Sequence, residues 1–403
     1  MSIDFADGVF HLRTDHASYA FALLEPGVLA HLHWGRKLRS PRLAQLRTTR
    51  ERAFSPTLGP HAPDASLDTL PQEFPSYGSG DFRAPAVEVQ AADGSTVSSL
   101  RYRRHRVARG KQPLPELPAV YVENEAEADT LEIELHDALT GLCATLSYSV
   151  FPAFDVITRA VRLRHEGAEA LTVRCLLSAS VDFPTADFCF LQLSGAWARE
   201  RHVVRAPLRP GTQSVESRRG ASSHQHNPFF ALLAAGADEE QGEVFGFSLV
   251  YSGNFLAGVE VDQFGTARAQ IGLNPFDFAW RLEPGGEFQS PEAVLVFSAE
   301  GLGGLSRCLH RCYRQRLCRG AWRDRPRPVL LNNWEATYFD FDADKIEAIA
   351  RAGRDLGVEL CVLDDGWFGR RDDDRSSLGD WTVDRRKLPG GLEDLAGRIT
   401  RLG

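Results

Sequence analysis

Two clusters of polar and aromatic residues follow short apolar runs in the C-terminal part of the sequence. They are Asn332-Asn333-Trp334-Glu335 and Asp364-Asp365-Gly366-Trp367. Carboxylates accept hydrogen bonds from hydroxyl groups, and indole faces stack on sugar rings, so this set suits a carbohydrate. An Asp-Asp pair at a strand end equally suits Mg²⁺ in a phosphoryl-transfer enzyme, or the capping of the next helix and loop. The composition of the clusters alone leaves these three interpretations open.

The pattern around these clusters predicts two consecutive βα units from Pro328 onward. Short apolar strands are predicted over 329–331 and 358–363, and amphipathic helices over 344–356 and 392–402, with Gly357 at the helix C-cap position. Strands that are apolar on both faces indicate a parallel sheet covered by helices. In α/β barrels the working residues lie at the C-terminal ends of such strands. A complete (β/α)8 barrel needs about 250 residues, so we expect the chain to be a fragment of one.

The first 300 or so residues alternate apolar and polar side chains with a period of two. This pattern predicts antiparallel strands in a large β-sandwich, and it is clearest over 131–135, 144–150, 161–164 and 171–179. The stretch Thr49–Ala86, rich in Pro, Gly, Ser and aromatic residues, predicts a long ordered loop. Helical spacing follows over Leu305–Cys318, and Arg319–Arg327 is typical of a linker.

Composition excludes several classes of function. The 403 residues are 43% hydrophobic and 25% charged, which is typical of an ordinary globular protein. The net charge of −8 offers no basic field for nucleic acid. No apolar run reaches the roughly 18–20 residues of a membrane helix, and the N-terminus lacks a signal core. Seven cysteines without a C-x-x-C pair favour free thiols in a reducing cytoplasm.

Several other features could suggest a metal site. His31 and His33, like His224 and His226, share a strand face, and Cys308 and Cys312 share a helical face. We identify no completing ligand, so hydrogen bonding and core packing are the preferred interpretations, and no metal is expected. The run RRDDDR at 370–375 predicts a solvated, self-paired loop. Trp367 and Trp381 either line an outer pocket or pack the loop.

Long, irregular strings along the chain resemble glycoside hydrolase family 36, the bacterial and fungal type of α-galactosidase. The strings are LNNWEATYFDF at 331–341, VLDDGWFGRRDDDRSSLGDWTVDRRKL at 362–388, DTLPQEFPSYGSGDFRAPA at 68–86, LSGAWARERH at 193–202 and SSHQHNPF at 222–229. The resemblance extends over all 403 residues. It implies a β-supersandwich with a closing helix at 1–318, a linker at 319–327, and the first two βα units of an incomplete (β/α)8 TIM barrel at 328–403.

The resemblance also implies an activity, the removal of terminal α-linked galactose from melibiose- and raffinose-type galactosides. Retention of configuration needs a nucleophile and an acid/base with carboxyl groups about 5 Å apart. In the family both are aspartates on later barrel strands, so no catalytic residue is expected in this chain, and we expect the chain alone to be inactive. The family needs no metal or organic cofactor. Its members act on small-molecule galactosides, without nucleic acid or membrane.

Five substrate-binding residues are implied by the same resemblance. Asp364 and Asp365 match the pair that holds the 4- and 6-hydroxyls of galactose, and Trp334 matches a tryptophan that packs against the sugar. Trp197 matches a substrate-contacting tryptophan of the sandwich domain, with core packing as its alternative. Glu51 stands where the family usually has Asp on a loop that reaches a neighbouring subunit's active site in a homotetramer; its alternative is a solvated loop charge.

Two further readings of the function stay open. The chain could be a non-catalytic galactoside-binding or structural relic of the family. It could also belong to a related α-N-acetylgalactosaminidase or to a galactosyl transglycosylase that makes raffinose-type sugars.

Overall fold

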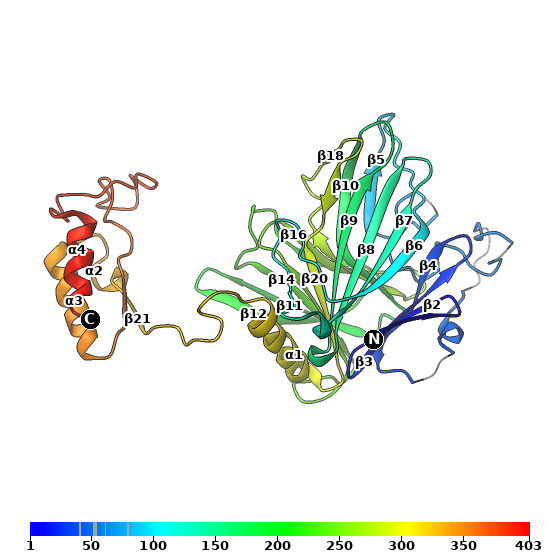
Figure 1. Cartoon of the computed structure of the whole chain (residues 1–403), viewed down its shortest axis with the longest axis horizontal. Coiled ribbons are helices and arrows are strands. Elements are labelled where there is room, and N and C mark those ends of the chain that lie inside the picture. The colour runs from blue at the N-terminus through cyan, green and yellow to red at the C-terminus, as the bar shows by residue number, and fades with distance from the viewer. Residues whose placement is uncertain (40–41, 51–54, 61, 79) are drawn as a thin grey trace. The chain divides into compact units, whose positions relative to one another are not determined.

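The computed structural model describes residues 1–403 except 40–41, 51–54, 61 and 79 (Figure 1). The chain divides into two compact units, Met1–Cys318 (unit 1) and Arg319–Gly403 (unit 2). Among the described residues, none of the helices combines the length and the apolar character needed to cross a lipid bilayer.

Unit 1 consists of three antiparallel sheets with sandwich-like packing. The four-stranded sheet contains β1 (Ile3–Ala6), β2 (Val9–Arg13), β3 (Ala17–Leu24) and β4 (Val28–Arg36) in that order. The six-stranded sheet contains β13 (Gly211–Glu216), β16 (Phe255–Val261), β17 (Ala267–Leu273), β10 (Leu171–Phe183) and β18 (Trp280–Leu282), with β5 (Val87–Gln90) also paired to β10.

The largest sheet has ten strands. Its order is β12 (Arg199–Pro207), β11 (Phe188–Ala196), β14 (His226–Ala234), β15 (Val244–Val250), β20 (Glu292–Ser298), β9 (Val156–His165), β8 (Leu142–Phe151), β7 (Asp129–His136) and β6 (Arg101–Arg109), with β19 (Glu287–Gln289) also paired to β9. Short 3₁₀ turns cover Leu43–Leu46, Glu125–Glu127 and Pro152–Phe154.

Alternating burial confirms the strands predicted from the period of two. On β7, Leu131, Ile133 and Leu135 are buried, whereas Glu132 and Glu134 lie on the opposite, more exposed face. Because the side-chain period is two, a one-residue shift in register would bury the glutamates, so the hydrophobic pattern determines the register. The buried faces of all three sheets contribute to one hydrophobic cluster.

The predicted helix over 305–318 is confirmed as α1 (Gly301–Arg316), which begins four residues earlier. It packs on the outer face of the ten-stranded sheet through Leu302, Leu305, Leu309 and Cys312. Cys312 therefore packs in a hydrophobic core, as its interpretation as a core residue predicted.

Unit 2 consists of a two-stranded parallel sheet and three helices. The elements are β21 (Leu330–Asn332), α2 (Trp334–Thr337), α3 (Ala343–Asp355), β22 (Leu360–Val362) and α4 (Gly391–Thr400), with β21 parallel to β22. The predicted strands and long helices are confirmed to within a few residues. The expected burial of both strand faces is not observed, because Leu330 and Leu360 are 51% and 42% exposed. Within unit 2, the helices cover only part of the sheet.

Helix α3 starts at a side-chain cap. The Asp342 carboxylate accepts a 2.8 Å hydrogen bond from the Lys345 backbone N–H. We expect Asp342→Ala to lower the free energy of unfolding of unit 2 by about 1 kcal/mol, because one N–H of the first turn loses its partner. Thermal unfolding followed by circular dichroism measures the change. An unchanged midpoint in Asp342→Ala would show that water satisfies this N–H equally well.

Candidate functional site

Asn332, the last residue of β21, and Asn333, which follows it, hold the first residue of the acidic pair that follows β22. The Asn332 side-chain amide donates to Asp364 Oδ2 at 2.5 Å, and the Asp364 backbone N–H donates to Asn333 Oδ1 at 2.8 Å. The Trp334 N–H donates to Asn332 Oδ1 at 2.8 Å. Asn332, Trp334 and Asp364 thus belong to one hydrogen-bonded network at the ends of adjacent parallel strands.

Asp365 is held by a buried arginine. Its Oδ1 accepts from Arg371 Nε at 2.5 Å and from the Gly366 N–H at 2.7 Å. The bond from Arg371 lowers the pKa of Asp365 below its usual value, so this carboxylate is ionised at neutral pH. Gly366 has a φ of 92°, a conformation that suits glycine. A residue with a Cβ at this position would strain the turn that follows Asp365.

A lysine joins the segments that follow the two strands. Lys387 Nζ donates to the carbonyl oxygens of Phe339, Gly366 and Arg371 at 2.8, 3.0 and 3.0 Å, and pairs with Asp372 at 3.2 Å. Phe339 follows β21, and the other two carbonyls follow β22. The ammonium group therefore ties the two loops of the site together.

Aromatic rings surround the polar network. Trp334 meets Tyr338 and Phe339 edge to face, with ring centroids 5.2 and 5.0 Å apart. Trp367 stacks on Trp381 at 6.3 Å, and it also packs against the hydrophobic cluster of unit 2. Trp367 thus packs the loop, whereas Trp381 is 66% exposed. Carboxyl groups beside partly exposed aromatic rings match the chemistry of a sugar site.

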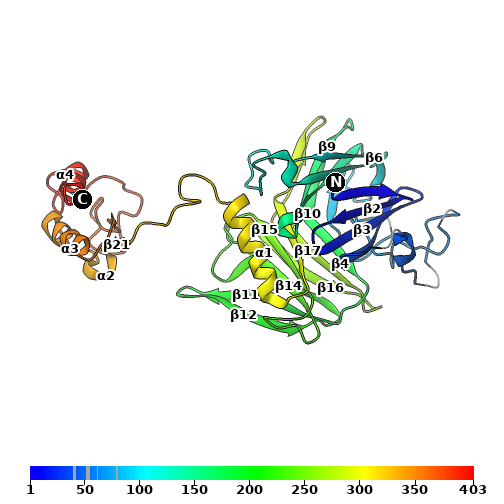
Figure 2. The ribbon, with the colours of Figure 1, turned by 60° about the horizontal axis from the view of Figure 1, so that its bottom comes forward.

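The two remaining predicted residues are placed differently. Trp197 lies at the turn between β11 and β12, in a hairpin that projects from unit 1 (Figure 2). It is 83% exposed, which excludes its alternative interpretation as a core residue. Glu51 lies outside the described residues.

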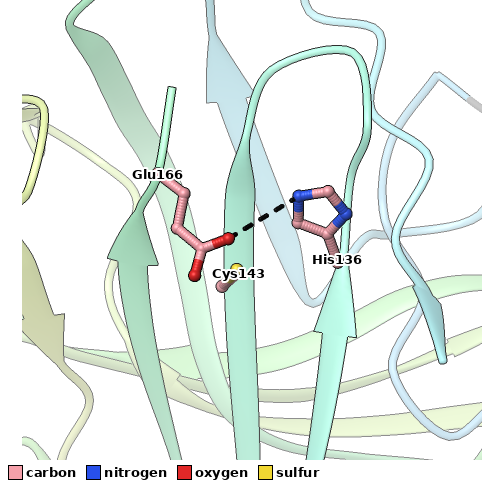
Figure 3. Close-up of side chains that lie close together, drawn as sticks. All are labelled: His136, Cys143 and Glu166. Carbon is pink, nitrogen blue, oxygen red and sulfur yellow. Dashed lines mark ion pairs between the residues drawn. The ribbon is translucent and has the colours of Figure 1, made fainter. Parts of the chain in front are cut away.

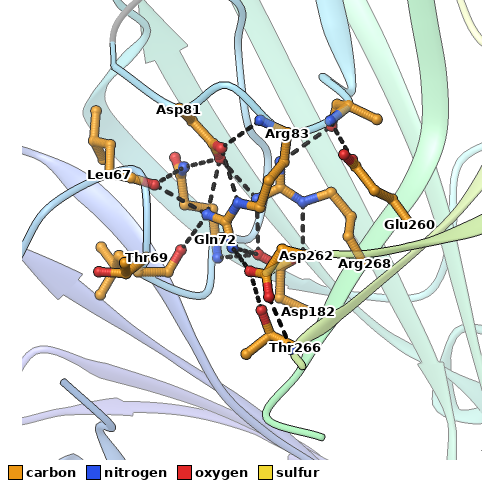
Figure 4. Close-up of polar contacts among 12 residues, drawn as sticks. Leu67, Thr69, Gln72, Asp81, Arg83, Asp182, Glu260, Asp262, Thr266 and Arg268 are labelled. Carbon is orange, nitrogen blue, oxygen red and sulfur yellow. Dashed lines mark hydrogen bonds and ion pairs between the residues drawn. The ribbon is translucent and has the colours of Figure 1, made fainter. Parts of the chain in front are cut away.

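The loop predicted over Thr49–Ala86 is irregular where it is described, and a buried ion network anchors it (Figure 4). Arg268 on β17 pairs with Asp81 of the loop at 2.7 Å and with Asp182 of β10 at 2.8 Å. Arg83 pairs with Asp81 at 2.8 Å and donates to the Leu67 and Leu70 carbonyls. These bonds hold the loop on the six-stranded sheet.

One cluster of metal-ligand types lies elsewhere in unit 1 (Figure 3). The ligand atoms of His136, Cys143 and Glu166 lie within 4.8 Å of one another. The Glu166 carboxylate already pairs with Arg103 at 3.0 Å and with Arg164 at 2.6 Å. Burial and the bond to Glu166 raise the pKa of Cys143 to about 11, which favours the neutral thiol. These contacts are those of an ion-pair cluster.

Three of the four histidines singled out as pairs, His31, His33 and His226, make hydrogen bonds within the protein. His31 Nδ1 contacts Glu73 Oε2 at 3.1 Å, His33 Nε2 contacts the Arg36 carbonyl at 3.0 Å, and His226 Nδ1 contacts Ser194 Oγ at 3.0 Å. Each contact agrees with the hydrogen-bonding interpretation of these side chains.

Comparison with known families accounts for nearly the whole chain. Residues 27–283 match the glycosyl hydrolase family 36 N-terminal domain, and residues 287–403 match the melibiase family. The chain belongs to glycoside hydrolase family 36.

Relatives within family 36 are α-galactosidases. The α-galactosidase AgaA of Geobacillus stearothermophilus is 59% identical over 394 residues, which are 98% of this chain and 54% of the relative. The α-galactosidase Mel36A of Lactobacillus acidophilus is 40% identical over 412 residues, covering 100% of this chain and 55% of the relative. The chain thus spans about half the length of these relatives.

Solved structures of family 36 agree with the fold. The crystal structure of AgaB from Geobacillus stearothermophilus superimposes with a TM-score of 0.95 at 57% identity, covering 100% of this chain and 56% of that one. A variant of AgaA in complex with raffinose superimposes with a TM-score of 0.95 at 59% identity, covering 98% of this chain and 55% of that one.

Sequence reasoning missed two residues of this family 36 chain, Arg371 and Lys387. The run at 370–375 was predicted to be solvated and self-paired, and this is wrong for Arg371. Its side chain is buried and pairs with Asp365, outside the run. Lys387 is the single lysine in the string at 362–388, which could have drawn attention to it. The spacing of residues along the sequence does not reveal its three carbonyl partners.

Proposed function

We propose that this chain supplies the galactose-binding part of the active site of an α-galactosidase that acts on melibiose- and raffinose-type galactosides. The observation that carries the proposal is the hydrogen-bonded network of Trp334, Asn332 and the Asp364–Asp365 pair at the ends of two parallel strands, in a family 36 chain. Within it, Asp364 and Asp365 accept bonds from the 4- and 6-hydroxyls of galactose, and Trp334 packs on the ring.

The architecture in this proposal is a β-supersandwich at 1–318, a linker at 319–327 and the start of a (β/α)8 barrel at 328–403. Two parallel βα units with polar residues after each strand support the barrel. Trp197 is proposed to contact the substrate, which its exposure favours, and Glu51 is proposed to reach a neighbouring subunit's active site in a homotetramer. The seven cysteines, all free thiols, support a cytoplasmic location.

The chemistry in this proposal needs two further carboxyl groups. Retaining hydrolysis uses a nucleophile and an acid/base about 5 Å apart across the scissile bond. Asp364 Oδ2 accepts from Asn332 and Asp365 Oδ1 accepts from Arg371, so both side chains are held in place. In this proposal the two aspartates bind sugar hydroxyls. We assign neither catalytic role to a residue of this chain, and we expect it to bind galactosides without hydrolysing them. No cofactor enters the proposal.

Ligand titration of the purified, mass-verified chain tests this proposal. Methyl α-galactoside should bind, and methyl α-glucoside, which differs only in the orientation of the 4-hydroxyl, should bind roughly ten-fold or more weakly. An aryl α-galactoside should be hydrolysed no faster in the presence of the chain than in buffer alone. Equal binding of the two epimers would reject the galactose site, and turnover would reject the expected inactivity.

A further inference from the structure

Arg371 lies in an arginine- and aspartate-rich loop, yet its side chain is only 7% exposed. The guanidinium lies 5.6 Å from the Phe339 ring centroid and 5.9 Å from that of Phe368. Its Nη1 donates to the Ser376 carbonyl at 2.7 Å while its Nε donates to Asp365. Packing and two bonds in different directions leave the guanidinium little rotational freedom.

The bonds to Asp365 are asymmetric. The structure records two hydrogen bonds to its carboxylate, one from Arg371 Nε and one from the Gly366 N–H. Both bonds end on Oδ1. A carboxylate oxygen with two donors has its acceptor capacity largely used. The other oxygen, Oδ2, is therefore the one that can accept from a sugar hydroxyl.

Lys387 acts on the loops rather than on one side chain. Its three ammonium donors match three backbone carbonyls, one after β21 and two after β22. Its 3.2 Å ion pair with Asp372 lies beside the same loop. An ammonium group centred on carbonyls of both loops fixes their separation, and with it the distance between Trp334 and the acidic pair.

We infer that Arg371 and Lys387 are positioning residues for galactose binding. Arg371 orients the Asp365 carboxylate so that Oδ2 is left for a sugar hydroxyl, and Lys387 holds together the two loops that carry the site. The inference rests on the proposed function, because it concerns the same sugar site.

The charges around Asp365 give this inference a pH signature. Arg371 is the main cause of its lowered pKa, followed by the Gly366 N–H and the positive charge of Lys387, against the effect of burial. Without Arg371 the pKa of Asp365 moves up toward the ordinary aspartate value. Binding through the ionised carboxylate is then lost at a higher pH as the solution is acidified.

The test compares binding of methyl α-galactoside, which carries no titratable group, by wild type, Arg371→Met and Arg371→Lys as the pH falls from about 7 to about 2.5, a range that extends below the ordinary aspartate value. Arg371→Met is expected to weaken binding about ten-fold at neutral pH and to raise the pH at which half of the binding is lost. Arg371→Lys keeps the positive charge but not the planar set of guanidinium donors. It should therefore lose half of its binding at the same pH as the wild type and recover only part of the affinity. Arg370→Met, which removes an exposed neighbouring arginine, is the matched control.

Two outcomes distinguish the inference from the proposed function. If wild type binds but Arg371→Met matches Arg370→Met in affinity and in pH midpoint, the inference is wrong and the proposed function stands. If the wild-type chain binds no galactoside, both the inference and the proposed function are wrong. If Arg371→Met fails to fold, the result for Arg371→Lys tests the inference by itself. An unchanged affinity in Arg371→Lys would show that the planar guanidinium is not needed to position Asp365.

Lys387 has a separate readout. In Lys387→Met, backbone amides after β21 and after β22 should exchange hydrogen about ten-fold faster or more, together with weaker binding. Lys387→Arg should rescue this in part, since it restores a donor group. Arg370→Met removes an exposed cation of the loop after β22 and should leave these amides unchanged. Unchanged exchange in Lys387→Met would overturn its role.

Discussion

Arg268→Met is expected to lower the free energy of unfolding of unit 1 by about 3–5 kcal/mol, because two buried carboxylates lose the cation they share and Arg83 alone is left to pair with both. Arg268 is 1% exposed, and Asp81 and Asp182 are each 2% exposed. Burial alone would raise the pKa of Asp182, but Arg268 and Arg83 outweigh it and hold that pKa below its usual value. Asp182 is thus buried in its charged form.

Urea unfolding of unit 1, followed by tryptophan fluorescence, measures this loss. Arg281→Met is the control, because Arg281 and Glu283 form an exposed ion pair whose removal costs less than about 1 kcal/mol. Adding Asp182→Asn to Arg268→Met should recover part of the stability, because Asp81 still pairs with Arg83 and the carboxylate that lost its closest cation is now neutral. A loss in Arg268→Met as small as that of the control would contradict the prediction.

The same network makes the stability of unit 1 depend on pH. Because the folded pKa of Asp182 is lowered, its contribution is present above the ordinary aspartate value of about 3.9 and is lost as the pH falls through the lowered folded value. Arg268→Met should lose much of this dependence.

The loop at 66–86 should also become susceptible to proteolysis in Arg268→Met, because Arg83, Asp81 and Arg268 tie it to the sheet.

Asp364→Asn and Asp365→Asn are each expected to weaken binding of methyl α-galactoside by roughly 10- to 150-fold, the value of one hydrogen bond to a charged group. In Asp365→Asn the bond from Arg371 also weakens, because its acceptor becomes a neutral amide oxygen, so the side chain is held less firmly. The double variant should bind no galactoside at measurable concentrations.

Isothermal titration calorimetry of each variant gives the affinities. Asp340→Asn, which changes an aspartate whose side chain is fully exposed, is the control within unit 2. The melting temperature of unit 2 should shift little in Asp364→Asn, because Asn332 can donate to an amide oxygen in place of a carboxylate oxygen. Affinities within two-fold of wild type in both single variants would contradict the assignment of the pair.

Much of the fold follows from local patterns. The alternation along β7, β8, β9 and β10 predicts antiparallel strands with one buried face, and the structure confirms them. The helical spacing of α1 and α3 predicts both helices to within a few residues. Side-chain periodicity suffices here because the strand period of two and the helix period of 3.6 are properties of the local backbone.

The candidate site is only partly predictable from the chain. Asn332, Trp334, Asp364 and Asp365 could be singled out because polar residues after apolar strands lie at one edge of a parallel sheet. Trp197 and Glu51 rest on the family resemblance, and their roles stay predictions. The catalytic carboxyl groups of the proposed mechanism lie among none of these residues.

The partners of the charged side chains were decided by the tertiary structure. Nothing in the run at 370–375 distinguishes Arg371, which is buried against Asp365, from its exposed neighbour Arg370. Lys387 reaches the carbonyl of Phe339 across 48 residues of sequence, and Arg268 reaches Asp81 across 187. Such pairs depend on where the chain returns in space, and burial then makes them strong because water no longer competes for the charges.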